Sequence, residues 1–148
     1  MTAEPTTPAP ACRQLLTFRV AGEWFALEVG RVRRVEPRPE LTPVPGAPQA
    51  LPGVFLSHGQ LVPALDPRVC LRLPAPAEAA PAFAVIAAEG DLSAGLLVDW
   101  VDDVVRVDET AIEPPAPGND CATGQVRLGN RLLSLLNLPA LFAAATGE

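Results

Sequence analysis

The feature that most constrains this 148-residue chain is that its second half repeats the pattern of its first. Three valines at three-residue spacing recur 69 positions later, as Val29, Val32, Val35 and then Val98, Val101, Val104. An apolar run recurs at a shift of 71, from Leu61, Val62, Leu65, Asp66 to Leu132, Leu133, Leu136, Asn137. Features that recur in one order predict a duplicated unit. The alternative is chance resemblance between alternating apolar segments.

Each repeat contains short strand-like runs, because 18 prolines and 11 glycines limit the length of any regular element. These runs come in pairs joined by short connections: 15–20 with 24–29, 54–56 with 61–65, and 83–88 with 94–98. The second pair, within 51–68, reads as a hairpin with an exposed polar corner at Ser57, His58, Gly59 and Gln60. The valine spacing predicts one or two helical turns at 29–35 and at 98–104, and 138–145 predicts a short C-terminal helix.

These elements predict an all-β fold of two small barrels packed together, with short helical turns and a short C-terminal helix. We expect a disordered tail at 1–13, a first unit at 14–73, a linker at 74–81 and a second unit at 82–148. Whether the two units exchange strands stays open.

Composition excludes several classes of partner and location. The net charge of −6 disfavours nucleic acid and anionic lipid. Neither an apolar run of membrane-spanning length nor a signal peptide is evident, so we expect a cytoplasmic protein without direct membrane insertion. Three widely spaced cysteines, Cys12, Cys70 and Cys121, predict reduced thiols rather than a disulfide framework.

No constellation of residues predicts catalysis. A hydrolytic triad would need the only histidine, His58, but the adjacent Ser57 would point the other way in a strand. No metal site can be assembled from one histidine without paired cysteines, and no phosphate-binding loop is present. We therefore predict no enzyme, no metal and no cofactor. A small hydrolase using His58 is the alternative from another class.

Surface features point to binding instead. Trp100 lies between Val98 and Val101, so its ring either projects as an interface anchor or folds over the edge of the second unit. Residues 1–73 carry 8 arginines and 6 acids, whereas residues 74–148 carry 3 arginines and 11 acids. Opposite charges on equivalent surfaces would recruit different partners or dock two copies head to tail.

Four segments together resemble the CheW-like adaptor domains of bacterial chemotaxis across Leu15–Phe142. They are LLTFRVAGEWFALEVGRVRRVEP, TPVPGAPQALPGVFLSHGQLVPALDPR, AGLLVDWVDDVVRVDETAIEPP and VRLGNRLLSLLNLPALF. The resemblance implies two SH3-like five-stranded β-barrels and a non-enzymatic scaffold. Such a scaffold would couple the regulatory domain of a CheA-like histidine kinase to the cytoplasmic tip of a chemoreceptor, recruited to membrane receptor arrays.

By the same resemblance, the kinase contact would involve the first unit around Val32, Val35, Leu41 and Val44. The receptor groove would lie between the units, near Gly53, His58, Gly59, Val101, Val104 and Val105. Several of these valines could equally serve the core.

One departure from the family pattern concerns the hairpin corner. Family members usually carry Asn, Leu, Arg, Gly where this chain has Leu56, Ser57, His58, Gly59. A permanent cation is replaced by a titratable ring. This motivates an alternative function, a divergent adaptor for another assembly such as a pilus-motility or polar-localisation system.

Overall fold

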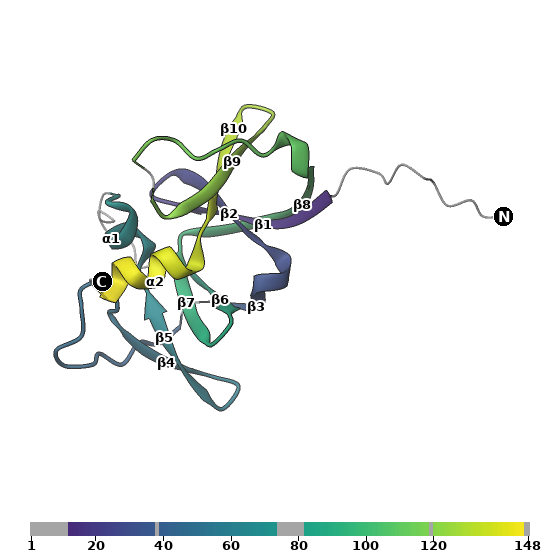
Figure 1. The fold of residues 1–148 in the computed structure, drawn as a ribbon. Coiled ribbons are helices and arrows are strands. Elements are labelled where there is room, and N and C mark those ends of the chain that lie inside the picture. The colour runs from purple at the N-terminus through teal and green to yellow at the C-terminus, as the bar shows by residue number, and fades with distance from the viewer. Residues whose placement is uncertain (1–11, 38, 74–81, 119, 147–148) are drawn as a thin grey trace.

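A computed structural model describes residues 12–37, 39–73, 82–118 and 120–146. Its strands are β1 Cys12–Val20, β2 Glu23–Glu28, β3 Val32–Pro37, β4 Gly53–Ser57, β5 Gln60–Leu65, β6 Phe83–Glu89, β7 Leu92–Val98, β8 Trp100–Asp108, β9 Ala122–Leu128 and β10 Arg131–Leu136 (Figure 1). The helices are α1 Pro67–Leu71 and α2 Leu138–Thr146, with 3-10 turns η1 Val29–Arg31 and η2 Glu109–Ala111. Residues 1–11 of the expected tail and the whole expected linker lie outside the described residues, and β1 already begins at Cys12.

The strands form two five-stranded sheets, which we call barrel A and barrel B. Barrel A has the order β8-β1-β2-β10-β9, and barrel B has the order β3-β6-β7-β5-β4. Each half of the chain gives its first hairpin to one barrel and its next three strands to the other. The two halves are therefore interlocked, and in both barrels a parallel pair, β2 with β10 or β7 with β5, joins strands from different halves.

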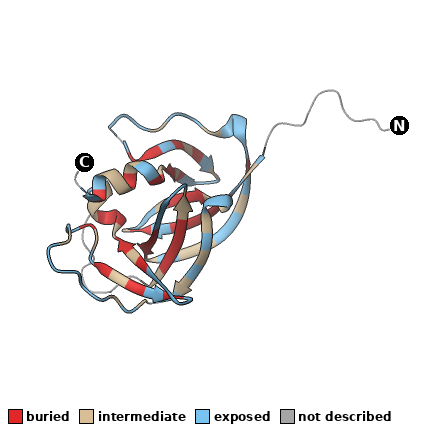
Figure 2. Cartoon of the chain, turned by 60° about the horizontal axis from the view of Figure 1, so that its bottom comes forward, coloured by how far each residue is buried: buried red, intermediate tan, exposed pale blue. Residues whose placement is uncertain are grey.

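The core has three parts, which follow from the alternation of side chains along the strands. One cluster lies inside barrel A and includes Leu15 and Leu133, and another lies inside barrel B and includes Phe55 and Ile86. A third cluster combines residues of both barrels with helix α2. Buried residues accordingly concentrate where strands and helix face one another (Figure 2). The expected all-β architecture of two packed five-stranded units with a short C-terminal helix is confirmed.

The expected helical turns are wrong, except for the three residues of η1. Val32 and Val35 lie in β3, and Val101 and Val104 lie in β8. In β8 the register shifts between Val101 and Val104: these valines are three residues apart, but the residues they oppose on β1 are only two apart. Strand β3 shows the same shift against β6. A β-bulge adds one residue to a strand, so apolar positions there recur every three residues instead of every two.

The shared bulge supports the duplication, as do two tight backbone approaches. A Cβ on Gly53 would lie 2.6 Å from the Thr42 carbonyl oxygen, and one on Gly124 would lie 3.0 Å from that of Glu113. Isolated bridges join Thr42 to Val54 and Glu113 to Gln125, again 71 positions apart. Both glycines therefore let a returning segment pack directly on the strand.

A partly buried ion pair fixes the point where the chain crosses from barrel B to barrel A. Asp99, between β7 and β8, accepts hydrogen bonds from the Arg68 guanidinium at 2.6 Å and from the Ala21 amide at 2.8 Å. Its own amide donates to the Arg19 carbonyl at 2.9 Å. The Arg68 side chain is only 7% exposed. Asp99 thus holds α1, the β1–β2 turn and the start of β8 together.

Candidate functional site

The polar corner of the β4–β5 hairpin is joined to strand β3 by side chains. Arg34 Nε donates to Ser57 Oγ at 2.9 Å, and Ser57 Oγ donates to the Glu36 carboxylate. His58 Nε2 lies 3.8 Å from that carboxylate. The Ser57 hydroxyl and the Arg34 guanidinium hold the pKa of Glu36 below its usual value. Since β3 and β4 are the two edges of barrel B, this network closes the barrel at its corner.

The turn at this corner needs an unusual backbone. His58 and Gly59 both have positive φ, 49° and 79°, as a type I′ hairpin turn requires. The His58 side chain is 71% exposed, so solvent or a partner can reach its ring. Its neighbour Ser57 is buried and donates to Glu36 rather than to the ring. The corner therefore lacks the serine-to-histidine hydrogen bond of a hydrolytic triad.

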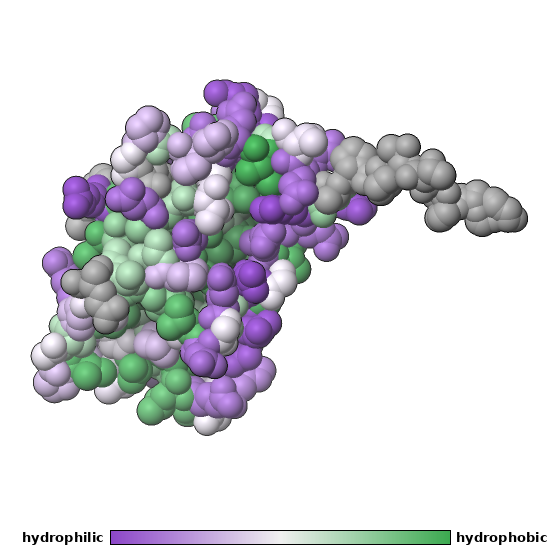
Figure 3. Space-filling view, viewed as in Figure 1, coloured by the Kyte–Doolittle hydropathy of each residue, from purple (hydrophilic) through white to green (hydrophobic). Residues whose placement is uncertain are grey.

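Barrel B carries an apolar surface beside the corner. Leu56 and Leu61 are cross-strand partners, and they are 67% and 70% exposed. Figure 3 shows hydrophobic side chains along the lower end of the molecule in this view, over β4 and β5. Neither leucine was predicted from the sequence to bind a partner, although both fall on the outward phase of the predicted hairpin. Exposed apolar patches commonly mark binding surfaces.

The residues expected to bind the kinase lie on β3 and on the segment that follows it. Val35 and Val44 are exposed large apolar side chains, 37% and 45%. Val32 and Leu41 are half-buried, and each packs against one of the hydrophobic clusters. Val35 and Val44 are therefore the two of these four that present most surface to a partner.

The residues expected to bind the receptor are split between the barrels. His58 and Gly59 are exposed at the corner of barrel B, whereas Gly53 is buried beneath Thr42. On β8 of barrel A, Val104 is 52% exposed, and Val101 and Val105 are half-buried against different clusters. Of the residues expected to bind the receptor, the exposed ones that can contact it directly are therefore His58 and Gly59 at the corner and Val104 on β8.

Trp100 begins strand β8 and is 52% exposed, so its ring does project, although from a strand and not from a helical turn. The ring also lies edge-on to Phe83, with ring centroids 6.0 Å apart. Strand β8 is an edge of its sheet, which leaves this apolar surface accessible.

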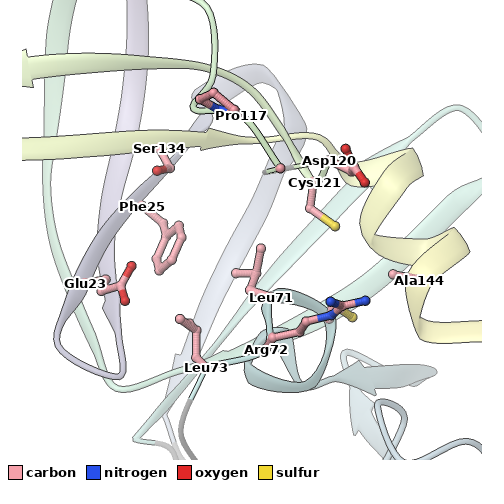
Figure 4. Close-up of a pocket in the computed structure, with 12 residues that line it drawn as sticks. Glu23, Phe25, Leu71, Arg72, Leu73, Pro117, Asp120, Cys121, Ser134 and Ala144 are labelled. Atoms are coloured by element: carbon pink, nitrogen blue, oxygen red, sulfur yellow. The ribbon is translucent and has the colours of Figure 1, made fainter.

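A cavity of about 410 Å³ opens between the helices and barrel A (Figure 4). Burial raises the pKa of the Cys70 thiol to about 11 and also raises the pKa of Cys121, so both thiols of this cavity stay protonated near neutral pH. Protonated thiols are poor nucleophiles.

Across the described residues no group of three or more histidine, cysteine or carboxylate side chains could hold a metal. None of the helices in those ranges is long and apolar enough to cross a membrane.

Two barrels with accessible apolar surfaces on each are typical of a protein-binding domain. The model of the CheW-like domain family matches residues 14–146. The chain is 32% identical over 146 residues to a chemotaxis protein CheW of Bacillus subtilis (strain 168), covering 95% of this chain and 91% of the relative. It is 28% identical over 141 residues to a chemotaxis protein CheW of Rhizobium meliloti (strain 1021), covering 92% and 91%.

The fold is also that of a solved relative. The crystal structure of scaffolding protein TtCheW from Thermoanaerobacter tengcongensis superposes with a TM-score of 0.81 at 24% identity, covering 90% of this chain and 93% of that one. The chain belongs to the CheW-like domain family. It is a chemotaxis adaptor and not an enzyme, and the hydrolase alternative is set aside.

Proposed function

We propose that this adaptor couples a CheA-type histidine kinase to chemoreceptors, and that it binds the two partners on separate surfaces. An adaptor of this kind must hold both proteins at once, which requires two separate surfaces. The observation that carries the proposal is that each barrel has its own exposed apolar side chains, Val35 and Val44 near barrel B and Val104 with Trp100 on barrel A. A pilus-motility or polar-localisation assembly is not favoured, since the relatives are chemotaxis proteins.

For the kinase, the contact is its regulatory domain on the β3 side of barrel B. Val35 and Val44 would supply exposed apolar area, while Val32 and Leu41 would support them from the half-buried layer. For the receptor, the contact is its cytoplasmic tip on β8 and the β4–β5 corner. Val104 would supply apolar area, with Val101 and Val105 beneath, and His58 with Gly59 would bound the groove. Buried Gly53 would act by shaping the corner strand.

Binding to both partners would place the protein in the cytoplasm at receptor arrays. The two contacts can be tested separately by calorimetry, with the kinase regulatory domain and a receptor cytoplasmic fragment from the same source. We expect Val44→Glu to weaken kinase binding at least about tenfold, or ~1.4 kcal/mol, and to leave receptor binding unchanged. Val104→Glu should do the reverse.

The matched control is Leu92→Glu, since Leu92 is another exposed apolar side chain at the start of β7 and belongs to neither surface. It should leave both affinities unchanged. Absence of kinase binding by the unaltered protein, or equal effects of all three variants, would defeat the proposal.

A further inference from the structure

Two basic side chains converge on one carboxylate oxygen at the corner of barrel B. Glu36 Oε2 lies 3.3 Å from Arg34 Nε and 3.8 Å from His58 Nε2. Arg34 and Glu36 belong to β3, whereas His58 belongs to the β4–β5 turn. An arginine at position 58 has a longer side chain than histidine, so it could reach the same oxygen. The Arg34 guanidinium therefore occupies a place that the corner arginine of family members could fill.

Arg34 contacts the corner more extensively than His58 does. Its Nε donates to Ser57 Oγ at 2.9 Å, and its Nη2 donates to the Ser57 carbonyl oxygen at 3.5 Å. The Ser57 hydroxyl donates in turn to Glu36. The Arg34 side chain is 30% exposed, against 71% for His58. The half-buried guanidinium is thus the group that ties β3 to the residue just before the turn.

The strands that form the corner carry few charges. Residues 53–65, which form β4, the turn and β5, contain no charged or titratable side chain besides His58. Burial alternates along β3, so Arg34 and Glu36 lie on one face and Arg33 lies on the other. A guanidinium keeps its charge at any physiological pH, whereas an imidazole changes charge between about pH 5 and 8. Arg34 is therefore the permanent cation of this corner.

We propose that β3 supplies the cation that family members carry on the hairpin, and that Arg34 is the positioning residue that holds His58 and Gly59 in place for the receptor. This inference rests on the proposed receptor contact at the β4–β5 corner. Arg34 acts through Ser57 and Glu36, which it contacts from the opposite edge strand of barrel B. Because the charge is kept at a new position, the corner retains its shape without the usual hairpin arginine.

Calorimetry with a receptor cytoplasmic fragment from the same source tests this inference by relocating the charge. Arg34→Gln should weaken receptor binding at least about tenfold, because the charge-assisted hydrogen bonds to the corner are lost. Adding His58→Arg to that variant should return the affinity to within about threefold of that of the unaltered protein. His58→Arg alone should change the affinity by less than about threefold, because Arg34 already supplies the cation.

The pH profile of receptor binding separates positioning by charge from a purely structural effect. Of the two bases at Glu36, only His58 remains in Arg34→Gln, so receptor affinity of this variant should rise as pH falls from about 8 to about 6. The affinity of the unaltered protein should change much less, because its guanidinium stays charged. Arg34→Gln combined with His58→Gln removes both bases, so any pH dependence that it retains belongs to the receptor fragment.

The matched control is Arg33→Gln, which removes the neighbouring arginine from the opposite face of β3. It should leave receptor affinity unchanged. Arg34→Lys is a milder substitution that keeps the charge without the forked donors, so its receptor affinity should be intermediate. Thermal unfolding of every variant separates loss of binding from loss of folding. Kinase affinity, measured in parallel, should be unchanged in Arg34→Gln.

Each failure has a separate signature. If the unaltered protein binds no receptor fragment, the proposed function fails, and this inference fails with it. If the unaltered protein binds and Arg34→Gln binds equally well, Arg34 only closes barrel B and the inference alone is wrong. A large gain from His58→Arg in the otherwise unaltered protein would also overturn it, because the corner would then lack its cation. A loss of kinase affinity in place of receptor affinity would overturn it by assigning Arg34 to the other contact.

Discussion

Removal of the Asp99 carboxylate is the perturbation that most directly probes how the two barrels are joined. In Asp99→Ala the buried Arg68 guanidinium loses the oxygen that lies 2.6 Å away, and the Ala21 amide loses its acceptor at 2.8 Å. Removing one partner of a buried ion pair typically costs about 3–5 kcal/mol, because the remaining charge loses its counter-charge. The Asp99 side chain is 35% exposed, so water screens the pair from one side. We therefore expect a loss near the lower end, about 3 kcal/mol.

Urea denaturation followed by circular dichroism measures this loss. With a slope of about 2 kcal/mol per molar urea, the midpoint should fall by roughly 1.5 M while the slope stays constant. The double variant Asp99→Ala with Arg68→Met tests the cause. It removes the charge that the single variant leaves buried, so it should regain at least about half of the lost stability. A single-variant loss below about 1 kcal/mol, or a double variant less stable than the single one, would refute this reasoning.

Three further changes have expected outcomes. Because the pKa of Glu36 is lowered in the folded protein, the ionised carboxylate stabilises the fold above the ordinary carboxyl pKa, and this stabilisation is lost as pH falls through the lowered pKa. Ser57→Ala should raise the pKa of Glu36, as measured by NMR titration. In the native protein near neutral pH, a thiol reagent should modify exposed Cys12 well before Cys70, whose pKa is about 11; equal rates would contradict the structure. Gly53→Ala should destabilise by about 1–3 kcal/mol in denaturant titration, because the added Cβ meets backbone that cannot rotate away.

Local patterns in the sequence were enough to predict the hairpins and the duplication. The β4–β5 turn is the best example, since His58 and Gly59 supply the two positive φ angles between alternating apolar runs. Alternation and turn chemistry act over a few residues and are visible in the sequence. The parallel ladder of β5 with β7 joins only Ala64 and Leu65, just beyond Pro63, which has no amide hydrogen to donate to a ladder.

The helical turns were mispredicted because two structures share one spacing. Valines three apart suit a turn of helix, but they also suit a strand with one extra residue, as β3 and β8 prove to be. Helix α1 was missed because it is only five residues long, although Asp66 caps it by accepting from the Arg68 amide and Pro67 occupies its first turn.

The candidate site depended on contacts that no local pattern encodes. Arg34 meets Ser57 only because barrel B brings its two edges together, and Arg19 meets Trp100 only because β1 and β8 pair across 81 positions of sequence. The exposed leucines of the corner needed the register of β4 with β5 before their shared outward face was evident. The pairing of β1 with β8 follows from the exchange of strands between the halves, and the sequence left that exchange open.

Simultaneous binding of the two partners is the most direct test of the adaptor account. Sedimentation velocity of the kinase regulatory domain, the receptor fragment and this protein together should reveal a complex heavier than either binary pair, and omission of this protein should abolish it. If the two partners instead displace one another from the protein, they share one surface, and the assignment of separate surfaces to kinase and receptor is contradicted.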